Sequence, residues 1–127
     1  MQKTELITEQ ALTHKEWLNL IGFYNDDLRI MENRIAEVNA KNTATEVRAM
    51  VEHFQNQVLI QRAHLDDLQR AIVHKQDANA AEILRNPVAA DHRRTAVDTD
   101  MHEGMDRFRE LFYEFRKELL VFLSKTL

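Results

Sequence analysis

The chain of 127 residues contains no cysteine, one proline and two glycines. Without cysteine it can form no disulfide, no thiolate metal site and no cysteine nucleophile. Sandwiches and barrels need turns rich in glycine or proline about every 8–12 residues, so the scarcity of both residues excludes a turn-rich β fold. A glycine-rich phosphate-binding loop is excluded as well, because Gly22 and Gly104 are far apart in the sequence.

Long apolar segments are also missing. The densest apolar run, residues 119–123, is only five residues long, whereas a membrane-spanning helix needs about 18. The first ten residues contain no apolar stretch of the kind found in a secretory signal. We therefore expect a cytoplasmic protein that does not enter a membrane.

Neither sign of charge dominates the chain. Acidic residues exceed basic residues by 21 to 17, which gives a net charge of −4 and no electrostatic basis for binding nucleic acid. Hydrophobic residues make up 44% of the chain, which is typical of a folded protein rather than a disordered one. A chain of this length can bury a single core, so we expect one domain spanning residues 1–127.

Three runs of apolar residues follow a heptad repeat, with spacings that alternate between three and four residues. The first extends from Trp17 to Val38 and the second from Val47 to Ile72, while the third begins at Met101. A period of 3.5 residues predicts helices that cross at shallow angles in a left-handed supercoil. The pattern therefore predicts an all-α fold with coiled-coil-like heptad packing.

Local signals mark the ends of the expected helices. Residues 43–46, Thr-Ala-Thr-Glu, match a capping box that would begin the second helix, and Asn86-Pro87 would end it. A second capping box begins at Thr13, although the helix could extend back to residue 3. We expect helices over about residues 3–41 or 13–41, 44–85 and 88–126. Short loops between helices of similar length favour an elongated antiparallel up-down-up three-helix bundle.

One end of this expected bundle is polar, because His14 continues the apolar seam of the first helix backwards. Folding the chain about the turns near residues 43 and 87 places His14, His74 and His102 within about one helical turn along the axis. Asp106 lies four residues after His102, on the same helix face. Histidine and carboxylate side chains bind zinc and iron. One hypothesis is therefore a metal- or small-ligand-binding site; the alternative is that His74 and His102 point to water.

No catalytic motif is present. The zinc-protease motif His-Glu-x-x-His and the di-iron motif Glu-x-x-His are both absent, and Ser124 is the single serine. We therefore predict a non-enzymatic protein without a cofactor.

The last expected helix carries a second apolar stripe beside its seam. Its members are Leu111, Tyr113, Leu120, Leu123 and Leu127, of which the first four are the candidate interface residues. A helix that touches two neighbours needs a broad apolar face, so the stripe either belongs to the core or forms a surface for a partner. The simplest partner is a second copy, which would make a homodimer. The leading functional hypothesis is protein–protein association, with a second copy of the chain as one candidate partner; metal or small-ligand binding is the alternative.

Overall fold

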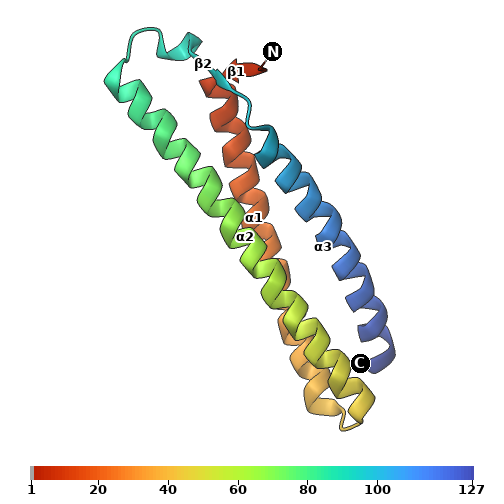
Figure 1. The fold of residues 1–127 in the computed structure, drawn as a ribbon. Coiled ribbons are helices and arrows are strands. Elements are labelled where there is room, and N and C mark those ends of the chain that lie inside the picture. Colours follow the sequence, from red (N-terminus) through yellow and green to blue (C-terminus); the bar gives the residue numbers. More distant parts are fainter. Residues whose placement is uncertain (1) are drawn as a thin grey trace.

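The computed structural model describes residues 2–127, and most of them lie in three long helices (Figure 1). The elements in chain order are β1 (Thr4–Leu6), α1 (Ile7–Lys41), α2 (Thr45–Arg85), the 3-10 helix η1 (Ala90–His92), β2 (Arg94–Ala96) and α3 (Thr99–Thr126). The helical class predicted by the apolar periodicity is confirmed. None of the helices in this described part is both long and apolar enough to cross a membrane.

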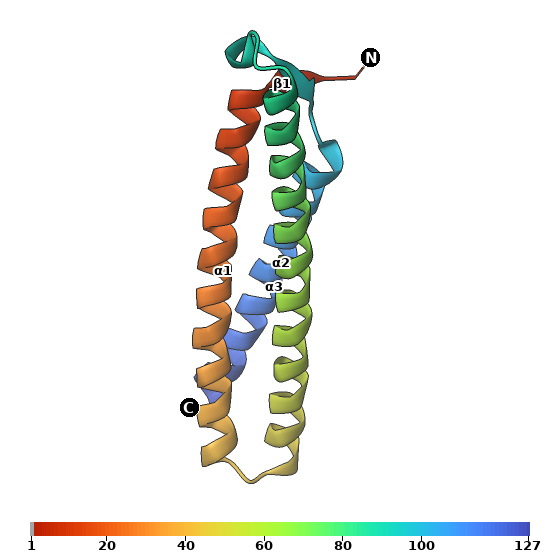
Figure 2. The same ribbon diagram turned by 90° about the vertical axis from the view of Figure 1, so that its left-hand side faces the viewer.

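The molecule is elongated along its helices. α1 and α2 lie side by side and are joined by a short turn, so that the chain reverses direction between them (Figures 1 and 2). α3 contacts both α1 and α2. Its last turn reaches the α1–α2 turn, where the Asn42 side-chain amide donates to the carbonyl of Thr126 at 3.4 Å.

The residues of the three apolar runs are buried or half-buried and form the core. Aromatic rings connect α3 to the other two helices. Tyr24 of α1 lies 5.1 Å from the ring of Phe108 and 4.7 Å from that of Phe112, measured between ring centroids. Phe54 of α2 lies 5.0 Å from Phe122. Each fully buried side chain of this size stabilises the fold by about 1.5–3 kcal/mol, so this shared core holds α3 in place.

The helix starts differ from the expected capping boxes. α2 is preceded by Ala44, which makes no side-chain cap hydrogen bond. α1 begins at Ile7, so Thr13 lies inside the helix, where its hydroxyl donates to the Glu9 carbonyl at 3.2 Å. Neither capping box therefore begins a helix. Packing of the apolar face contributes more to helix stability than one local hydrogen bond does.

The prediction that the last helix begins near residue 88 is wrong. It begins at Thr99, and the Asp98 carboxylate caps it by accepting from the Met101 amide at 3.0 Å. The segment before it folds irregularly, with Ala89 in the left-handed conformation at φ 54°. Arg93 stabilises this segment, since its guanidinium donates to the carbonyls of Asn86 and Val88.

Two short strands form an antiparallel ribbon that the sequence pattern did not predict. Thr4 pairs with Ala96 and Leu6 pairs with Arg94. The ribbon covers the end of the molecule opposite the α1–α2 turn (Figures 1 and 2). Strands of three residues are too short to show the alternation by which strands are recognised in a sequence.

Candidate functional site

Buried polar side chains gather beneath the ribbon, at the end that the sequence analysis expected to be polar. The Gln10 amide nitrogen donates to a Glu5 carboxylate oxygen at 2.9 Å and to the Ala96 carbonyl at 3.1 Å. The Gln10 amide oxygen accepts from the Asn79 side chain at 2.6 Å. These three bonds join β1, β2, α1 and α2 at one point.

His14 lies one helical turn after Gln10 and is only 1% exposed. Its Nδ1 atom has no hydrogen-bond partner among residues 2–127. Burial is the main cause that lowers the pKa of His14, and the charges of Lys75 and His102 act in the same direction, while Glu5 and Asp98 oppose them. Removal from water disfavours the charged imidazole, so His14 is neutral near pH 7.

The proposed metal ligands do not come together. His14 and His102 both lie near Trp17, whose ring is 5.9 Å from His14 and 4.7 Å from His102 between centroids. His74 and Asp106 are exposed to solvent on α2 and α3. Within the described residues no group of three or more histidine, aspartate and glutamate side chains is arranged to hold a metal ion.

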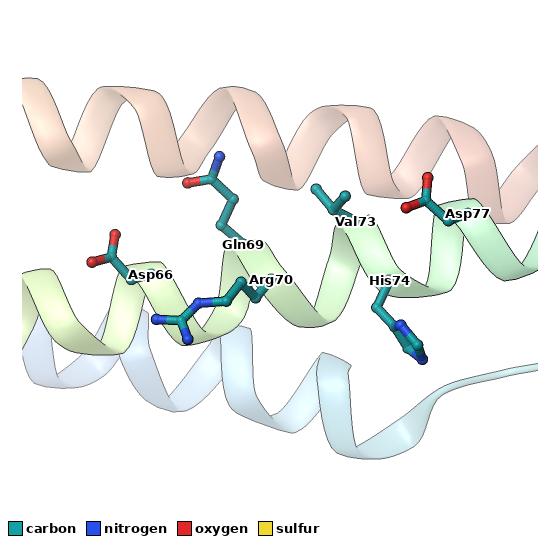
Figure 3. A pocket seen from close by; sticks show the side chains of 6 residues that line it. All are labelled: Asp66, Gln69, Arg70, Val73, His74 and Asp77. Carbon is teal, nitrogen blue, oxygen red and sulfur yellow. The ribbon is translucent and has the colours of Figure 1, made fainter.

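His74 lies in a surface depression of about 500 Å³ (Figure 3). Its lining residues are Asp66, Gln69, Arg70, Val73, His74 and Asp77. All six belong to α2, and their side chains extend from this one helix (Figure 3). Ligand sites usually surround most of their ligand with apolar walls. A depression built on a single helix, with charged residues along it, offers no such enclosure.

The predicted interface residues divide among three places. Leu123 is 9% exposed and belongs to the core of its own chain, so a partner could not reach it. Leu111 is exposed on the flank of α3 that faces α2, beside Leu68. Tyr113 and Leu120, which are seven residues apart, lie on the other flank. That flank also carries Arg116, which donates to Asp27 of α1 at 3.2 Å.

An apolar groove between α2 and α3, near the α1–α2 turn, was missed by the sequence analysis. Its volume is about 410 Å³, and its lining includes the rings of Phe54 and Phe122, which are tilted to each other with their centroids 5.0 Å apart. We call it the α2–α3 groove. Its lining residues are Met50, His53, Phe54, Lys117, Glu118, Val121, Phe122 and Lys125. The sequence does carry a signal for this groove, because Met50 and Val121 are both apolar and each is one residue from a seam position.

Comparisons with models of known protein families, with curated proteins and with solved structures find no match.

Proposed function

We propose that the protein is a non-enzymatic helical bundle that acts by associating with another protein molecule, namely a second copy of itself. The observation that carries this proposal is the α2–α3 groove, which opens to solvent between two helices and is lined by the exposed side chains of Met50 and Val121 beside the half-buried Phe122. Grooves of this shape bind the apolar face of an amphipathic helix. Filling the groove with such a helix would remove apolar surface from water, which drives most protein association.

The architecture we propose is an antiparallel up-down-up three-helix bundle packed through its heptads. The burial of the seam residues and the aromatic contacts of α3 with both neighbours support it. In such a bundle a helix from another chain can lie between two existing helices and complete a four-helix arrangement. The α2–α3 groove offers that position.

The buried polar cluster supports a structural role rather than catalysis. Gln10 and Asn79 are hydrogen-bonded to each other, and Gln10 is also bonded to the backbone. A general base needs a proton of its substrate within hydrogen-bond reach, and His14 is 1% exposed beneath the ribbon. This cluster therefore joins secondary-structure elements.

The test is the mass of the purified protein in solution as a function of its concentration. Sedimentation velocity from low micromolar to millimolar protein should show a mass that rises above that of one chain, because association follows mass action. A mass equal to that of one chain throughout this range would contradict the proposal.

A further inference from the structure

The outer face of α1 carries an apolar and acidic ridge. Phe23 and Ile30 are 73% and 57% exposed. Seven residues separate them, so they share a face and lie about 10 Å apart along the helix. The positions of this face at heptad spacing, here called the α1 ridge, are Glu16, Asn19, Phe23, Asp26, Ile30, Asn33 and Glu37. Three of these seven residues are acidic and none is basic.

The α2–α3 groove has the complementary character. Lys117, Glu118 and Lys125 line it, and Lys117 is paired with Glu114 of the same helix at 3.7 Å. Lys125 makes no ion pair within residues 2–127. The wall that α3 gives to the groove runs from Lys117 to Lys125 and is about 12 Å long at the helical rise. This length is close to the distance between Phe23 and Ile30 along α1. Size and charge both match the ridge to the groove.

Ridge and groove lie on opposite sides of the molecule. α1 packs against both other helices, with Glu32 paired to Arg62 of α2 at 3.1 Å and Asp27 paired to Arg116 of α3 at 3.2 Å. The face of α1 between these two flanks is buried, so the α1 ridge faces away from α2 and α3. A single molecule therefore cannot place its own ridge in its own groove.

We propose that copies of this chain associate head to tail, with the α1 ridge of one copy lying in the α2–α3 groove of the next. The inference rests on the proposed self-association and names the two surfaces that make it. Phe23 and Ile30 enter the groove above the rings of Phe54 and Phe122, and the ridge carboxylates approach Lys117 and Lys125.

The local ion pairs of the ridge do not oppose this contact. Asp26 is paired with Arg29 at 2.7 Å and Glu37 with Arg34 at 3.2 Å. These pairs are exposed, and exposed ion pairs contribute little to stability, so the carboxylates can exchange one cation for another. Glu16 makes no ion pair among the described residues.

A head-to-tail contact leaves one ridge and one groove free at the two ends of every assembly that does not close into a ring. This property separates it from a symmetric dimer and gives a mixing experiment. Val121→Glu places a carboxylate in the groove and leaves the ridge intact. Phe23→Glu removes the aromatic ring of the ridge and leaves the groove intact. Each variant alone should sediment as a single chain at concentrations where the unmodified protein associates.

Mixing the two variants should restore one contact and only one. The intact ridge of the Val121→Glu chain enters the intact groove of the Phe23→Glu chain, which gives a 1:1 dimer that does not grow further. Leu84→Glu, at the far end of α2, and Leu120→Glu, on the other flank of α3, are matched controls and should associate like the unmodified protein. Circular dichroism should show that every variant keeps its helices.

The possible results separate this inference from the proposed function. If the unmodified protein associates and the two variants associate equally well, the head-to-tail contact is overturned while self-association stands. If both variants are monomeric and their mixture stays monomeric, the contact is symmetric and the inference is again overturned. If the unmodified protein is monomeric at all concentrations, the proposed function fails as well. Should Val121→Glu unfold the chain, Met50→Glu on the opposite rim replaces it.

Discussion

His14 illustrates how one buried side chain couples stability to pH. Its pKa in the folded protein is lowered from 6.5, mainly by burial. Between the lowered pKa and 6.5 the unfolded chain binds more protons at this residue than the folded chain does, so the free energy of unfolding rises with pH in this window. Above pH 6.5 His14 is neutral in both the folded and the unfolded chain, and its full contribution to the free energy of unfolding is present. Below the lowered pKa it is charged in both, and a further drop in pH removes no more stability at this residue.

We therefore expect the urea midpoint of unfolding to fall as the pH drops below 6.5 toward the lowered pKa of His14. His14→Gln, which keeps a neutral polar side chain at this position, should remove this part of the pH dependence. His74→Gln changes an exposed histidine and should leave it in place. Equal pH dependence in His14→Gln and the unmodified protein would contradict the assignment to His14.

Leu120 and Leu123 form a second matched pair at this scale. Leu123 belongs to the core, so Leu123→Ala should lower the free energy of unfolding by about 2–5 kcal/mol. Leu120 is exposed on the surface of α3, so Leu120→Ala should change it by no more than about 0.5 kcal/mol. Urea denaturation followed by circular dichroism measures both values. Similar losses for the two variants would place Leu120 in a buried environment as well.

Sequence reasoning located the site residues along the molecular axis but not around each helix. Counting from the turns brought His14 and His102 to the same end, where both lie near Trp17. His74 follows the seam residue Ile72 by two positions, and two residues rotate a helix by about 200°. It therefore points to solvent. The same rotation separates Leu111 from Tyr113.

At the scale of elements, helix interiors were predictable and helix ends were not. The apolar repeat extends over many residues, so the positions of α1 and α2 survive an error at any single residue. The end of a helix depends on a few atoms. Asp98 caps α3, for example, and the three-residue strands lie where the start of a helix was expected. The β1–β2 pairing joins Thr4 to Ala96, which are far apart in the sequence, and no local pattern encodes such a contact.

The hydrogen bond between Gln10 and Asn79 joins α1 to α2 beneath that ribbon. The stability lost when this bond is removed should depend on whether one or both of the amide side chains are replaced. Gln10→Leu leaves the Asn79 amide buried without its partner, which should cost about 1–3 kcal/mol of unfolding free energy. Gln10→Leu combined with Asn79→Leu removes both polar groups, so the double variant should lose less than the sum of the two single variants. Urea unfolding of the four proteins measures this coupling, and strictly additive losses would mean that the two amides act independently.

At the scale of the whole molecule, the charge pattern makes a prediction for association. The ridge is acidic and the groove rim carries two lysines, so their attraction is screened by salt over about 10 Å at 0.1 M ionic strength. The sedimentation mass at a fixed protein concentration should therefore fall as sodium chloride is raised, while the helical circular dichroism stays constant. An association that strengthens with salt would show that apolar contact alone drives it.

Trp17 is the single tryptophan of the chain, and it lies at the ribbon end close to two histidine rings. Its fluorescence therefore reports on that end alone, whereas circular dichroism averages over all three helices. Coincident transitions by the two signals are the mark of all-or-none unfolding. The position of one indole ring thus allows a spectrometer to decide whether the long helices melt as one cooperative unit or open first from the end that the ribbon covers.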